Sequence, residues 1–153
     1  MEHINIQEGC EMPLSSLQGI AKNSKRNLRG AVLQLQACRM NPKLQINPQA
    51  KLKPEWKKAV AEIASNIMKE QSPRALKNLR EKIYELLVNC IPSDLIVKVL
   101  LDELLLACSP NLQPEIVHWV AYYENKMQQG SKPLWHMEAM ISKIMVLLKE
   151  NAY

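Results

Sequence analysis

The chain has 153 residues, 47% hydrophobic and 23% charged, a composition typical of a globular protein that can bury a sizeable core. Its four cysteines have no C-x-x-C spacing, which favours reduced thiols, and its first residues lack the apolar run of a signal peptide. The net charge of +5 comes entirely from residues 1–53. Residues 1–53 hold eight Lys/Arg and three Asp/Glu, whereas residues 54–153 hold twelve of each. This asymmetry indicates either an anionic neighbour for the first third or a solvated basic face.

The first third of the chain predicts two short helices. Residues 1–12 show no helical period, and we expect them to be disordered. Apolar residues recur at helical spacing over residues 13–21 and again over residues 25–39, where Leu28 and Leu35 share the expected inner face. Residues 41–53 contain two Asn-Pro steps and no helical period, which indicates a linker.

From residue 54 onward the pattern predicts a bundle of about five helices. Ser72-Pro73 is typical of a helix start, and Gly130 is expected to end the helix that precedes it. The helix over residues 94–107 is apolar on every face, so other helices or a partner must cover it; we expect it to be the core of the bundle. No segment alternates with period two, so the sequence predicts an all-α chain.

The chain contains no motif typical of an enzyme. Its four glycines fit neither the P-loop nor the G-x-G-x-x-G spacing. A metal site formed by Cys108, His118 and His136 is conceivable, but a lone helical histidine is more often structural. We therefore predict a protein without catalytic residues, metal or cofactor.

Several blocks of the sequence resemble a known family. YELLVNCIP (84–92), the LLDELL helix (100–105) and AYYENKMQQGSKPLWHMEAMISKIM (121–145) are similar to the C-terminal region of replication factor C subunit three. This subunit is a small component of the eukaryotic DNA clamp loader, an AAA+ machine. KNSKRNLRGAVLQLQACR (22–39) is similar to the AAA+ lid helix that carries the sensor-2 arginine. AEIASNIMKEQSP (61–73) resembles the plant members.

The resemblance implies a domain organisation and a role. Residues 54–153 would be a clamp-loader collar, the C-terminal oligomerisation domain, and residues 13–40 a lid remnant. The chain would be a non-catalytic assembly module of the hetero-pentameric clamp loader, acting in the nucleus in replication and repair. It would meet the sliding clamp and DNA indirectly, and no membrane. Arg29 matches the sensor-2 position, but Walker A and Walker B motifs are lacking, so ATP would be bound only if an ATPase domain were supplied.

Two sets of residues are candidates for binding. The aromatic side chains Trp119, Tyr122, Tyr123 and Trp135 are the expected anchors of an interface with other subunits. Alternatively, the chain is a small basic DNA-binding protein that acts through residues 22–53. Its phosphate contacts would then come from Lys22, Lys25, Arg26, Arg29 and Arg39. A truncated subunit with no retained role is a further alternative.

Overall fold

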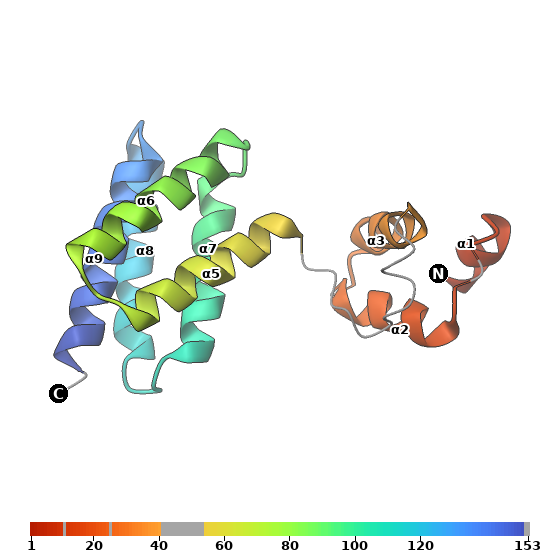
Figure 1. Ribbon diagram of the computed structural model, residues 1–153, viewed down its shortest axis with the longest axis horizontal. Coiled ribbons are helices and arrows are strands. Elements are labelled where there is room, and N and C mark those ends of the chain that lie inside the picture. The colour runs from red at the N-terminus through yellow and green to blue at the C-terminus, as the bar shows by residue number, and fades with distance from the viewer. Residues whose placement is uncertain (11, 25, 41–53, 152–153) are drawn as a thin grey trace. The chain divides into compact units, whose positions relative to one another are not determined.

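The computed structural model describes residues 1–10, 12–24, 26–40 and 54–151, so Lys25 and the expected linker 41–53 lie outside the described residues. All regular secondary structure in these ranges is helical, which confirms the all-α prediction (Figure 1). The chain divides into two compact units, Met1–Lys53 and Pro54–Tyr153. Within the described ranges, no helix has both the length and the apolar character needed to cross a membrane.

The described residues of the first unit form three helices and a small core. They are α1 (Glu2–Gln7), α2 (Leu14–Asn23) and α3 (Leu28–Met40). Helix α2 packs on α3, because both present apolar residues at helical spacing to the same small core. The buried side chains of this core are Met12, Leu17, Ile20, Ala31, Leu35 and Cys38. A core of this size covers only one face of each helix.

Helix α1 corrects the expectation of disorder over residues 1–12. Asn5 joins it to Met12: Oδ1 of Asn5 accepts a hydrogen bond from the Met12 N–H at 3.2 Å, and Nδ2 donates to the Met12 carbonyl at 3.3 Å. Met1 and Ile4 pack against the same core, and Glu8 forms an ion pair with Arg39 at 3.6 Å. These contacts join residues that are distant in sequence, so a search for local periodicity does not detect them.

Helix α3 begins three residues later than predicted. Oδ1 of Asn27 accepts a hydrogen bond from the Gly30 N–H at 3.0 Å, and the Asn27 carbonyl accepts from the Ala31 N–H at 3.0 Å. Asn27 is therefore the N-cap of α3. Arg26 has φ of 68°, outside the helical region, which is why the helix does not extend to it. Leu28, expected to face inward, falls in the first turn and is 69% exposed.

The second unit is a bundle of five helices: α5 (Glu55–Lys69), α6 (Pro73–Val88), α7 (Ser93–Ala107), α8 (Gln113–Gln129) and α9 (Pro133–Glu150) (Figure 1). The predicted start of α6 is confirmed, since Oγ of Ser72 accepts a hydrogen bond from the Ala75 N–H at 3.1 Å. Helix α9 packs on α5, α6 and α8. Four of its side chains are completely buried: Met137, Met140, Ile141 and Ile144.

Helix α7 is not the centre of this bundle. Its main contacts are with α5 and α8, and it buries one face, made by Ile96, Val97, Leu100 and Leu104. On the other side Leu106 is 84% exposed and Leu95 is 43% exposed. The expectation that the other helices pack around this apolar helix is wrong, because two neighbours cover only about half of a helix surface. Helices α9 and α5 each contact three other helices.

The end of α6 has a left-handed residue. Cys90 has φ of 58° and is exposed. The Ile91 N–H donates to the Leu86 carbonyl at 3.3 Å and the Cys90 N–H donates to the Leu87 carbonyl at 3.0 Å. This pair of bonds is the Schellman motif, in which glycine is the usual residue at the position of Cys90.

Replacing Cys90 by glycine should therefore stabilise the protein. A side chain in the left-handed region costs about 1–2 kcal/mol, and the greater freedom of glycine in the unfolded chain returns up to ~1 kcal/mol of that. We expect Cys90→Gly to raise the free energy of unfolding by roughly 0.5–1 kcal/mol in urea titrations. Cys90→Ala, which removes the thiol and keeps the backbone strain, is the control. An equal gain from both variants would contradict this explanation.

Candidate interaction surface

A cluster of aromatic rings lies on α8. The Trp119 ring is 5.8 Å from the Tyr122 ring and 6.3 Å from the Tyr123 ring, measured between centroids. Tyr122 and Tyr123 meet edge to face at 5.2 Å, and His118 contacts Trp119 in the same way at 5.5 Å. We call these four residues the α8 aromatic patch. Three of the four predicted interface anchors thus belong to one contiguous surface.

The members of the α8 aromatic patch differ in burial. Tyr122 is 46% exposed, whereas Tyr123 is half-buried and packs against the bundle core. The two side chains therefore point in different directions, as expected for neighbours about 100° apart on a helix. Trp119 is half-buried as well. The half-buried rings of Trp119 and Tyr123 are held in place by packing against their neighbours, while the exposed ring of Tyr122 is accessible to a partner.

Two lysine ammonium groups lie over the rings of this patch. Nζ of Lys143, from α9, is 4.7 Å from the Trp119 ring centroid, and Nζ of Lys126 is 5.5 Å from the Tyr122 centroid. Cation–π contacts of this kind hold ring and lysine stem together at a partly exposed site. The surface is consequently apolar at its centre and positively charged at its edge. A partner with apolar and acidic side chains would complement it.

The fourth predicted anchor, Trp135, belongs to a different surface. It lies in the first turn of α9, is 57% exposed, and has the Arg80 guanidinium 5.6 Å from its ring centroid. Arg80 also forms an ion pair with Glu138. Trp135 lines a shallow groove between α6 and α9 whose other apolar residues are Tyr84, Leu87, Val88, Pro133 and Leu134. The sequence alone did not separate these two aromatic surfaces, because the separation depends on how α6, α8 and α9 pack.

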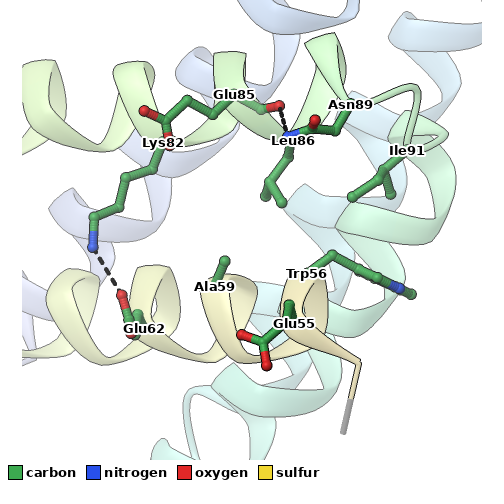
Figure 2. A pocket seen from close by; sticks show the side chains of 9 residues that line it. All are labelled: Glu55, Trp56, Ala59, Glu62, Lys82, Glu85, Leu86, Asn89 and Ile91. Carbon is green, nitrogen blue, oxygen red and sulfur yellow. Dashed lines mark hydrogen bonds and ion pairs between the residues drawn. The ribbon is translucent and has the colours of Figure 1, made fainter. Parts of the chain in front are cut away.

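Sequence reasoning missed a pocket between α5 and α6, which Figure 2 shows. Trp56, Leu86 and Ile91 supply apolar walls, and an ion pair of 3.1 Å between Lys82 and Glu62 crosses one side. The remaining lining residues are Glu55, Ala59, Glu85 and Asn89. Trp56, in the first turn of α5, is half-buried beside the pocket and packs against the bundle core. The lining residues form no nucleophile–base pair, so the pocket has no catalytic constellation.

The basic residues of the first unit lie at its surface. Lys22, Arg26 and Arg29 are exposed, and Arg29 lies in the first turn of α3. Arg39 is bound to Glu8 by the ion pair described above, which neutralises part of its charge. Lys25 lies outside the described residues. All four described candidates for phosphate binding are therefore exposed, and one of them, Arg39, is in an ion pair.

The conceivable metal site is not assembled. In the described part of the chain, no three His, Cys, Asp or Glu side chains come together in a way that would hold a metal ion. His118 lies against Trp119, and His136 lies beside Gly130. Sγ of Cys108 is 3.7 Å from Sδ of Met68, and burial raises the pKa of the Cys108 thiol above its ordinary value. A raised pKa favours the neutral thiol, which is a poor metal ligand.

The fold defines a class of domain: an all-α bundle with an exposed aromatic surface, typical of a domain that associates with other proteins. Residues 56–152 match the family described as replication factor C subunit 3, C-terminal domain. This match covers the five-helix bundle from α5 to α9, and the chain belongs to that family. The resemblance expected from the sequence is confirmed.

Curated relatives extend the similarity to the first unit. Replication factor C subunit 5 of Oryza sativa subsp. japonica is 44% identical over 98% of this chain and 42% of its own length. Replication factor C subunit 3 of Arabidopsis thaliana is 42% identical over 97% of this chain and 42% of its own length. Subunit 3 of Homo sapiens is 38% identical over 94% of this chain and 40% of its own length. The chain spans about two-fifths of the length of these relatives.

Proposed function

We propose that the chain is a non-catalytic assembly module of the replication factor C clamp loader. Its bundle would take the place of a collar among the other subunits of the hetero-pentamer, and so take part in loading the sliding clamp onto DNA in the nucleus. The observation that carries the proposal is the family match over the whole bundle. No catalytic residue or cofactor is proposed for these 153 residues. ATP becomes relevant to Arg29 only when an ATPase domain is supplied.

The α8 aromatic patch is the surface that we propose for contact with a neighbouring subunit. Tyrosine and tryptophan are the residues that most often dominate binding energy, since they bury a large area and lose little conformational entropy. The exposed ring of Tyr122 rests on the half-buried Trp119 and Tyr123, so its position is already set before binding. A pre-positioned ring lowers the entropy lost on association.

We expect Tyr122→Ala to weaken the association of the chain with the other replication factor C small subunits by about tenfold, equivalent to ~1.4 kcal/mol. The assay is co-expression with those subunits, followed by size-exclusion chromatography and a binding titration. Tyr84→Ala is the matched control. Tyr84 is also an exposed tyrosine on a helix of the same bundle, but it lines the α6–α9 groove beside Trp135.

The two variants separate the possible outcomes. Co-elution of the wild-type chain, lost in Tyr122→Ala and kept in Tyr84→Ala, supports both the function and the surface. The opposite order would move the interface to the groove around Trp135. If the wild-type chain is folded by circular dichroism and elutes alone, the assembly function is refuted. The exposed Lys22, Arg26 and Arg29 would then be tested for salt-dependent DNA binding.

A further inference from the structure

The outer face of α7 combines exposed apolar residues with two opposite charges. Leu95, Val99 and Leu106 recur at intervals of four and seven residues and so lie on one side of the helix, where Val99 is half-buried and also contacts the bundle core. Leu106 is 84% exposed and Leu95 is 43% exposed. Lys98 and Asp102 lie between them on the same side, both exposed. We call these five residues the α7 outer face.

The order of residues on the α7 outer face is self-complementary. Along the helix, the midpoint of Leu95 and Leu106 lies between residues 100 and 101. The midpoint of Lys98 and Asp102 lies at residue 100, so the two pairs have nearly the same centre. When two identical helices pack antiparallel around a two-fold axis at this centre, each Lys98 faces the Asp102 of the other copy. Leu95 of each copy then faces Leu106 of the other. Both the apolar pair and the charge pair are satisfied by the same axis, as an isologous interface requires.

The exposed leucines make solvation of this face costly. Leu95 and Leu106 are separated by about 16 Å along the helix, at 1.5 Å per residue, so the apolar ends span three turns. Helices α5 and α8 already cover the opposite side of α7. An antiparallel helix pair would remove both leucines from water and replace the missing neighbours.

We propose that the α7 outer face binds the same face of a second copy of this chain, with the two helices antiparallel. The inference is independent of the clamp-loader function, because it uses α7 and leaves the α8 aromatic patch free. One helix face per protomer buries less area than the roughly 1,200 Å² of a stable specific interface. The dimer is therefore weak, with a dissociation constant on the order of 0.1 mM, a value accessible to sedimentation at high protein concentration.

Exchange of the two charges on the 153-residue chain tests this arrangement. In Lys98→Glu, the new carboxylate of each copy faces Asp102 of the other copy, so two repulsive pairs form across the axis. We expect the dissociation constant of the dimer to rise at least tenfold. The double variant K98E/D102K restores the opposite charges across the two-fold axis and should recover dimerisation to within about threefold of the wild type. A partner of different sequence would not show this recovery, because both of its complementary charges would now be mismatched.

Substitutions of exposed apolar residues by aspartate provide a second test. Leu106→Asp should abolish dimerisation, whereas Val146→Asp, a change at an exposed valine of α9, should leave it unaltered. Both variants are checked for helical content by circular dichroism. A chain that stays monomeric at millimolar concentration overturns the proposal. So does a dimer that is insensitive to Leu106→Asp, or one that K98E weakens and K98E/D102K fails to restore.

Discussion

Truncating Leu100 to alanine should destabilise the bundle by about 3–4 kcal/mol, whereas the same truncation at Leu106 should cost less than ~0.5 kcal/mol. The two leucines lie on the same helix, α7, six residues apart, and their exposed fractions are 1% and 84%. Leu100→Ala removes buried methyl groups and leaves a cavity among tightly packed neighbours. Leu106→Ala removes groups that are already in contact with water.

The measurement is equilibrium unfolding in urea at micromolar protein concentration, where the proposed dimer is dissociated. The pair is a direct test of whether α7 is a central or a peripheral helix. Costs of similar size at both positions would mean that α7 is covered on all sides. That result would contradict the exposure of the α7 outer face and the packing of α7 mainly on α5 and α8.

Replacing Gly130 by alanine should cost roughly 1–2 kcal/mol, because overpacking of about 1–3 kcal/mol exceeds the up to ~1 kcal/mol that alanine gains by restricting the unfolded chain. Gly130 follows α8 with φ of −98° and ψ of 163°, an extended conformation that any residue can adopt. The prediction of a helix end is right, but left-handed geometry is not the reason for the glycine. A Cβ at this position would lie 2.5 Å from Nε2 of His136 and 3.2 Å from the Lys126 carbonyl oxygen.

A double-mutant cycle separates the two contacts. In a His136→Ala background the ring is gone, and the cost of Gly130→Ala should fall by about 1 kcal/mol or more. The remaining cost reports the approach to the Lys126 carbonyl. Thermal or urea unfolding of the four proteins gives the coupling free energy. A coupling free energy of zero would show that the His136 ring does not require glycine at position 130.

Most helices of this protein could be predicted from local sequence. The stripe of Val60, Ile63 and Ile67 in α5 is buried as its spacing predicts, and Ser72 caps α6. Periodicity and capping depend on residues within one or two turns, so they can be read without knowing the tertiary contacts. The family resemblance also rests on short stretches of sequence, and the family match over residues 56–152 confirmed it. Helix type and family were therefore accessible from the sequence, whereas α1 and the start of α3 were not.

The position of each helix within its unit was decided by tertiary packing. The composition of α7 suggested a central helix, but its main contacts are with two helices, whereas α9 and α5 each contact three. The four most buried side chains of α9 are Met137, Met140, Ile141 and Ile144. Trp119, Tyr122 and Tyr123 are neighbours because they lie three and four residues apart on α8, whereas the packing of α6 on α9 placed Trp135 in another groove. Apolar side chains specify that a surface prefers to be covered, and not which neighbour covers it. Which neighbour covers an apolar face depends on how all the helices of the bundle pack together.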